Sequence, residues 1–251
     1  MSSLSAGLPA VPVEAHELVR HLPLPVRGPG AAFGLVALVV VLAVLASLPF
    51  VWAMDLSPGP MVKSNTGPML LSVATTQAVF ALGAYLLALG DRPVVQRLAL
   101  DIGPPLGARD YLAAFGACLG ATTLYNGVRE FGLGHDVLAD LKLLAPFFRM
   151  PLWPLSFLVI AVVAPIAEEL LFRGILLPEL ARTRLGFWGA AVVSTLGWTV
   201  LHTYSIAGML LVFLLGMIFS WLFARTGSLR VPIMAHMANN AIACLMLQFV
   251  V

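Results

Sequence analysis

The chain has 251 residues, of which 60% are apolar and only 10% are charged, and its mean hydropathy is +0.97. This composition lies outside the range of soluble domains and excludes water as the main solvent of the folded chain. The formal net charge of +2 comes from scattered loop arginines rather than from a basic face, so we expect no bound nucleic acid.

Long apolar stretches predict an all-α, polytopic bundle of transmembrane helices, because about 20 apolar residues cross the hydrocarbon core as one helix. A transmembrane barrel would instead need roughly ten-residue segments that alternate apolar and polar side chains, and the sequence has no such alternation. We expect about seven spans, within a range of six to eight. They are 31–54, 67–90, 111–126, 152–172, 187–202, 204–223 and 232–251.

The pattern divides the chain into three regions. Residues 1–30 hold five prolines and both charge signs, which is typical of a flexible or interfacial tail and not of a cleaved signal peptide. We therefore expect the first apolar run to be retained. Residues 31–150 form an N-terminal transmembrane region of about three spans, in which 127–150 indicates an amphipathic interfacial segment. Residues 151–251 form a C-terminal region of four spans.

The distribution of Lys and Arg predicts the orientation of the chain, because cytoplasmic loops collect these residues. With the spans above, ten of the fourteen lie on the same side as the N-terminus and four lie on the other side. We therefore expect a multi-pass protein of the cell membrane whose N-terminus is cytoplasmic.

Polar groups inside the C-terminal spans mark the candidate functional site, because each ionisable group there costs a few kcal/mol on insertion scales. The conspicuous groups come from three segments. They are Glu168, Glu169, Arg173, His202, His236, Asn239 and Asn240. The N-terminal region has no comparable group of polar residues within its spans. Burial of Gln77 there costs little free energy, because a neighbouring helix can easily supply hydrogen-bond partners for its amide.

The first segment carries two adjacent carboxylates. Glu169 and Arg173 are four residues apart and share a helix face, so they can pair. Glu168 points about 100° further round the helix and stays free for another role, which makes it the better catalytic candidate. The structural alternative is an ordinary ion pair at a helix end.

The other two segments repeat the four-residue spacing. Trp198 and His202 predict an aromatic wall beside an imidazole, and His236 shares a helix face with Asn240. Asn239 points elsewhere, toward a neighbouring helix. Each segment taken alone also has a structural explanation, namely a His bonded to a carbonyl or polar groups that join helices. The presence of three such segments in one chain favours a functional site over these structural explanations.

Together the segments supply a carboxylate, two imidazoles and an amide, which fits amide hydrolysis by an activated water. One Glu with two His is also a familiar zinc set, so the sequence leaves a divalent metal open, although the His-Glu-x-x-His helix of many zinc proteases is absent. An ion-coupled transporter is a weaker alternative, because the polar groups gather in one half of the chain and no internal repeat is visible.

In this combination the chain resembles the CAAX protease and bacteriocin-processing family, also called the CPBP or ABI family, of intramembrane glutamic endopeptidases. The resemblance covers roughly residues 152–251 and depends on three motifs that occur in the family's order. They are Glu168-Glu169-Leu-Leu-Phe-Arg173, Trp198-Thr-Val-Leu-His202 and His236-Met-Ala-Asn239-Asn240. The second motif commonly begins with Phe, so we expect Trp198 to narrow the pocket without abolishing activity.

The resemblance implies a catalytic and a supporting set of residues. The catalytic set is Glu168 and His202 for water activation, with His236 and Asn240 for the oxyanion. The supporting set is Glu169, Arg173 and Trp198. The implied function is an intramembrane endopeptidase without cofactor or metal, acting on a membrane-associated peptide or protein within the lipid bilayer. A non-catalytic immunity or scaffold protein of the same fold is the alternative, and the sequence does not predict an oligomeric state.

The predicted depths of these residues disagree. Glu168 and His236 lie near the cytoplasmic ends of their spans, whereas His202 is about 15 residues, or roughly 22 Å, from the start of its helix. A common site requires that the glutamate helix continues toward Leu180 and that the His202 segment tilts or begins nearer Ala190. The site would then lie in the cytoplasmic half of the membrane and open toward the cytoplasm.

Overall fold

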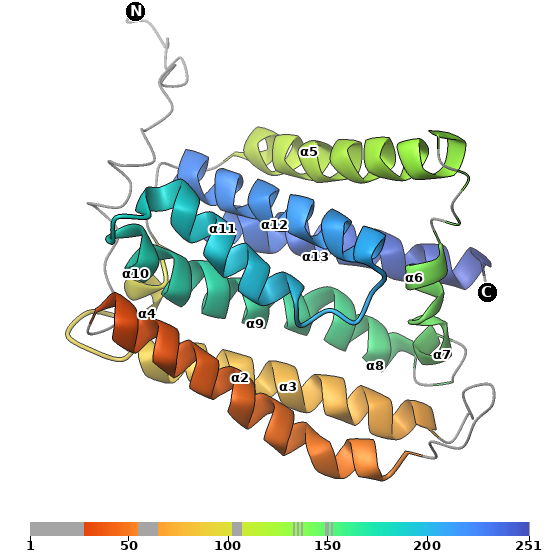
Figure 1. The fold of residues 1–251 in the computed structure, drawn as a ribbon, viewed down its shortest axis with the longest axis horizontal. Coiled ribbons are helices and arrows are strands. Elements are labelled where there is room, and N and C mark those ends of the chain that lie inside the picture. Colours follow the sequence, from red (N-terminus) through yellow and green to blue (C-terminus); the bar gives the residue numbers. More distant parts are fainter. Residues whose placement is uncertain are drawn as a thin grey trace, which may run out of the picture.

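The computed structural model describes residues 28–54, 65–101, 107–132, 134, 136, 138–148, 151 and 153–250, with side chains up to residue 247. Within these ranges the chain forms helices and no strand, which confirms the all-α prediction. The long helices lie side by side in one bundle (Figure 1). The predicted tail, residues 1–30, lies almost wholly outside the described residues.

The described part of residues 28–148 begins with four α-helices. They are α2 (Pro29–Trp52), α3 (Thr66–Leu87), α4 (Val94–Arg97) and α5 (Ala108–Gly127). The last of them continues as a π-helical segment, η2 (Val128–Gly132). Two one-turn helices follow, α6 (Ala139–Lys142) and α7 (Ala145–Phe148).

The C-terminal region opens with a continuous 29-residue helix, Trp153–Ala181, and ends with three more helices. The segments of the long helix are α8 (Trp153–Phe157), η3 (Leu158–Val163), α9 (Ala164–Glu169), η4 (Leu170–Leu176) and α10 (Leu177–Ala181). The others are α11 (Gly186–Thr199), α12 (Ile206–Thr226) and α13 (Arg230–Val250).

Each of the seven predicted spans corresponds to a helix of the bundle. Within the described ranges, four helices are long and apolar enough to cross a membrane on their own: α2, α3, Trp153–Ala181 and α12. The remaining predicted spans correspond to α5, α11 and α13, which lie alongside these four (Figure 1). The protein is therefore a helical membrane bundle.

Helix α2 buries mostly small side chains and exposes large apolar ones, as expected where lipid is the solvent. On α2 the inward face carries Ala32, Val36 and Ala43, whereas Leu38 and Leu45 are exposed. Neighbouring α3 approaches this inward face closely, because a Cβ atom at Gly83 would lie 2.7 Å from both methyl carbons of Val39. Close helix contact rather than an amphipathic stripe thus holds this pair together.

Within the predicted amphipathic segment, residues 127–150, the described stretch 138–148 packs against the bundle through α7. In α7, Phe147 and Phe148 are buried in a cluster with Leu70 of α3, Val159 of η3 and Leu247 of α13. The segment therefore joins the N-terminal helices to the C-terminal region.

The contact between Gly83 and Val39 generates a stability prediction. Gly83→Ala should lower the free energy of unfolding by about 1–2 kcal/mol, because overpacking outweighs the gain in helix propensity. Thermal unfolding in detergent measures this effect. Gly120→Ala is the matched control, since Gly120 is a helical glycine whose added Cβ would meet nothing within 4 Å. Equal unfolding temperatures for the two variants would contradict the packing account.

Candidate functional site

The two glutamates lie near the middle of the longest helix of the bundle. Helix Trp153–Ala181 continues past Arg173, which confirms the predicted extension toward Leu180. At 1.5 Å per residue, Glu168 is roughly 22 Å from one end of this helix and roughly 20 Å from the other. The extension therefore places both carboxylates deep within the bundle.

Two π-helical segments flank the glutamates, and a proline follows each of them by two residues. Pro165 comes after η3 and Pro178 after η4. A proline has no N–H to donate, and its ring needs room near the carbonyl one turn back, which the wider π turn provides. The short α9 turn between the two segments carries Glu168 and Glu169.

The first proline leaves a backbone carbonyl that Asn240 satisfies. In η3 the hydrogen bonds run five residues back, as from the Ala164 N–H to the Val159 carbonyl. Pro165 cannot make the next such bond, to Ile160, and the Asn240 amide nitrogen donates to the Ile160 carbonyl instead, at 3.1 Å. One N–H of Asn240 therefore has a structural role and joins α13 to the glutamate helix.

Glu169 forms the predicted ion pair with Arg173. The Arg173 guanidinium donates to Glu169 Oε1 at 2.9 Å, and both side chains are fully buried. Its second terminal nitrogen donates to the Gly216 carbonyl of α12 at 3.1 Å. A Cβ at Gly216 would lie 2.7 Å from that nitrogen, so glycine is needed there for the close approach of α12. The prediction that these two residues pair is confirmed.

Glu168 receives hydrogen bonds from two neutral side chains. Gln77 of α3 donates to Oε1 at 2.8 Å, and the indole N–H of Trp198 donates to Oε2 at 2.8 Å. Glu168 is only 8% exposed, so these donors replace water that the bundle excludes. The sequence missed Gln77 because an amide in a span has many structural explanations.

His236 lies against both carboxylates. Its Nδ1 is 3.1 Å from Glu169 Oε1, and because a carboxylate accepts, Nδ1 carries the proton of that bond. Its Nε2 is 4.0 Å from Glu168 Oε2, and its ring stacks on Phe219 with centroids 4.7 Å apart. Nδ1 is thus engaged by Glu169, while Nε2 faces the neighbouring Glu168.

His202 lies beyond the end of its helix. The predicted helical span 187–202 is shorter in the structure, since α11 ends at Thr199 and a tight turn follows. The His202 ring is nevertheless 4.8 Å from the Trp198 ring, and Nδ1 is 3.1 Å from the Trp198 carbonyl, which fixes the proton on Nδ1. Of the two adjustments considered for this segment, a tilt or a start nearer Ala190, the later start is wrong, because α11 begins at Gly186.

Trp198 is the side chain that joins these groups. Besides the bond to Glu168, its ring lies 4.6 Å from the Arg173 guanidinium and 5.4 Å from the His236 ring. A Phe at this position would keep the ring contacts but could not donate a hydrogen bond to Glu168. The departure from the common family residue therefore adds a donor to the site.

Asn239 points away from this cluster, as predicted. Its side-chain oxygen accepts a hydrogen bond of 3.4 Å from the Thr122 hydroxyl of α5. Asn239 therefore bonds a neighbouring helix, while His236 and Asn240 lie on the side of the glutamate helix.

No three His, Cys, Asp or Glu side chains in the described part of the chain are grouped so that they could hold a metal ion. Buried polar atoms without a protein partner do lie on the site residues themselves. They are Gln77 Oε1, Glu169 Oε2 and Arg173 Nε. These atoms can bind water or a polar group of a ligand.

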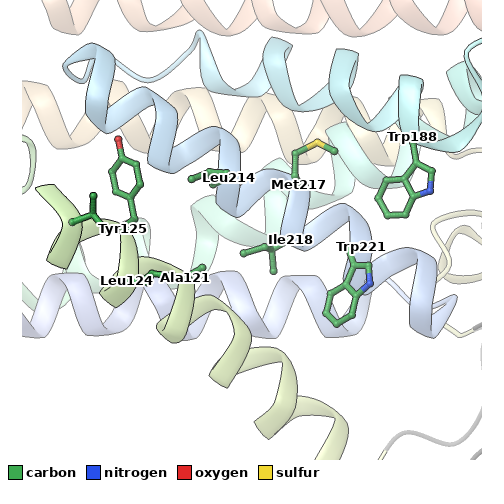
Figure 2. A pocket seen from close by; sticks show the side chains of 9 residues that line it. Ala121, Leu124, Tyr125, Trp188, Leu214, Met217, Ile218 and Trp221 are labelled. Atoms are coloured by element: carbon green, nitrogen blue, oxygen red, sulfur yellow. The ribbon is translucent and has the colours of Figure 1, made fainter. Parts of the chain in front are cut away.

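An apolar groove of about 570 Å³ lies elsewhere, between α5, α11 and α12. Figure 2 shows its aromatic lining, with Tyr125 at one end and Trp188 and Trp221 at the other. None of the predicted catalytic or supporting residues lines it. The candidate site is therefore defined by the buried polar cluster and not by this groove.

Comparison with known proteins finds a family that is similar to the same region. The family model described as Type II CAAX prenyl endopeptidase Rce1-like matches residues 150–242. The C-terminal region is therefore similar to this family. This confirms the resemblance to the CAAX protease family that the three motifs indicated, and the match contains all seven predicted site residues.

A curated protein is also similar to part of the chain. It is the Bacillus subtilis (strain 168) protein named "Putative membrane peptidase YdiL", which is 33% identical over 93 residues. The match covers 37% of this chain and 37% of the relative. No solved structure matches the chain significantly.

The hydrogen bond from Trp198 to Glu168 generates the second prediction. Trp198→Phe should lower the free energy of unfolding by about 1.5–3 kcal/mol, because a buried carboxylate loses a donor. Thermal unfolding in detergent again measures the change. Trp221→Phe is the matched control, since Trp221 is 41% exposed and lines the apolar groove. A Trp198→Phe protein no less stable than the control would show that the indole N–H is dispensable.

Proposed function

We propose that the protein is an intramembrane endopeptidase that hydrolyses a peptide bond of a membrane-associated peptide or protein by means of an activated water. The observation that carries the proposal is that the two adjacent glutamates have different partners. Glu169 is neutralised by Arg173, whereas Glu168 is held only by neutral donors and faces His236 Nε2 at 4.0 Å.

Glu168 is the proposed general base. A carboxylate offers about four lone-pair sites, so Oε1 and Oε2 can each accept from a water besides Gln77 and Trp198. The buried setting strengthens the interaction of this carboxylate with a reacting water. Its two donors fix its orientation, which favours proton transfer along one direction.

His202 is the proposed partner in water activation. With the Nδ1 proton directed to the Trp198 carbonyl, Nε2 carries the lone pair and can accept a proton. Trp198 lies between the two groups, since its indole N–H donates to Glu168 and its ring lies beside the imidazole of His202. Both groups can thus act on one water in front of the indole.

His236 and Asn240 are the proposed oxyanion site. When His236 is protonated, Nδ1 donates to Glu169 and Nε2 donates to the oxygen that becomes negative, and the Glu169 carboxylate stabilises the imidazolium. Asn240 uses one N–H for the Ile160 carbonyl and keeps the other for the same oxygen. Arg173 and Glu169 hold this half of the site in place.

The proposed substrate is a peptide or protein that reaches the site from the bilayer. The name of the matched family, a CAAX prenyl endopeptidase, makes a prenylated C-terminal peptide one such substrate, and a leader peptide is another. We further propose a cytoplasmic N-terminus and a site that opens toward the cytoplasm, on the distribution of Lys and Arg.

The third prediction tests the catalytic assignment. Glu168→Gln and His202→Ala should each reduce cleavage by at least about a hundredfold, because both groups act on the same water. Cleavage is measured by comparing the termini of membrane proteins in cells that carry the wild type and in cells that carry each variant. Termini that are found with the wild type alone identify the substrate.

Glu168→Gln is a suitable probe because the site can accommodate it. A flipped Gln77 amide would present Oε1, which has no partner in the wild type, to the new amide. Glu168→Gln should therefore elute from size-exclusion chromatography as the folded protein does, and the same measurement checks that His202→Ala is folded. Turnover retained in either variant would overturn the mechanism, and activity lost to a strong chelator and restored by zinc would overturn the metal-free assignment.

A further inference from the structure

The connection between α11 and α12 carries His202 and is anchored by an aspartate from a distant part of the chain. Asp140 Oδ1 accepts from the Ser205 N–H at 2.7 Å, and Asp140 Oδ2 accepts from the Ser205 hydroxyl at 2.7 Å. Asp140 belongs to α6, which lies beside this connection (Figure 1). Both oxygens of one carboxylate thus hold one residue of the connection.

The same contact fixes the start of α12. The Ser205 hydroxyl accepts from the Gly208 N–H at 3.0 Å and thereby caps the helix. Gly208 lies so close to Asp140 that a methyl group in its place would overlap the carboxylate. A glycine at this position therefore permits the approach of α6.

A second hydrogen bond holds the first turn of α12 from the side of α5. The Tyr125 hydroxyl donates to the Ala207 carbonyl at 2.7 Å. On the other side, the short segment after Thr199 is closed by the tight turn that places His202 Nδ1 against the Trp198 carbonyl. Ser205 follows His202 by only three residues, so the position of Ser205 limits where the imidazole can lie.

We propose that Asp140 is a positioning residue, which holds the connection between α11 and α12 so that His202 Nε2 faces the reacting water. This inference rests on the proposed function. It also gives the amphipathic segment a role, because α6 belongs to the predicted interfacial stretch 127–150 and acts on the site through this contact. Asp140 itself touches no substrate atom in this account.

The test compares three variants of the full-length protein. Asp140→Ala removes both hydrogen bonds, and Ser205→Ala removes only the bond from the hydroxyl. Asp140→Asn keeps the shape of the side chain and both contacts to Ser205. The Oδ1 of the new amide still accepts from the Ser205 N–H, and its Nδ2 can donate to the Ser205 hydroxyl. The measurements are hydrogen–deuterium exchange of the peptide that covers residues 200–208 and, with a peptide that spans an identified cleavage site, kcat and KM.

Asp136→Ala is the matched control. Asp136 lies in the same segment, and its carboxylate accepts hydrogen bonds from the Lys142 ammonium and from the Leu138 N–H, both at 2.9 Å. The hydrogen bond from Lys142, followed by that from Leu138, holds the pKa of Asp136 below its usual value. The control therefore removes a negative charge close to α6 without removing either hydrogen bond to Ser205.

Asp140→Ala should speed exchange in residues 200–208 by at least about fivefold and lower kcat by about 10–100-fold, with KM changed by less than about threefold. Asp140→Asn should restore kcat to within about fivefold of the wild type. The kcat of Ser205→Ala should lie between those of Asp140→Ala and Asp140→Asn. Unchanged exchange or unchanged kcat in Asp140→Ala would overturn the inference. A wild-type protein that cleaves nothing would instead reject the proposed function, and the exchange data would still decide whether Asp140 holds the connection.

Discussion

Two adjacent carboxylates buried in the middle of a membrane helix, with one arginine to neutralise them, are the constraint on which the rest of the structure depends. The free-energy cost of burying two unpaired carboxylates at this depth would be too high for a stable fold, and Arg173 can pair fully with only one carboxylate. Arg173 lies four residues from Glu169 and pairs with it, which leaves Glu168 to be satisfied by neutral donors. Adjacent identical side chains thus acquire different chemistry from their position on the helix.

The packing of the neighbouring helices follows from this division. The Arg173 guanidinium donates to the Gly216 carbonyl, which requires a close approach of α12. Glu168 accepts a hydrogen bond from Gln77, which requires that α3 packs against the same part of the glutamate helix. On α13, His236 joins both carboxylates and Asn240 satisfies the carbonyl that Pro165 leaves free. A residue such as Asn240 can therefore serve the fold and the proposed chemistry together, because an amide nitrogen has two protons to donate.

The sequence predicted the helical bundle, the ion pair of Glu169 with Arg173 and the separate direction of Asn239, because these depend on hydropathy and on spacing within one helix. It did not predict Gln77, whose importance depends on which helix packs beside it. The end of α11 before His202 was also missed, since polar contacts from α6 to the next helix, rather than a local stop signal, hold the turn that follows. Local periodicity of the sequence does not predict contacts between distant segments. The roles of the site residues stay predictions.

The most direct test of the central claim is the thermal unfolding, side by side, of Glu168→Gln and Glu169→Gln in the same detergent. If Glu169 is the structural carboxylate, Glu169→Gln leaves Arg173 as a buried charge without its partner and should lose about 3–5 kcal/mol of unfolding free energy. Glu168→Gln should stay within about 1 kcal/mol of the wild type, because neutral donors surround it. Equal losses, or a larger loss for Glu168→Gln, would contradict the division of roles between the two glutamates.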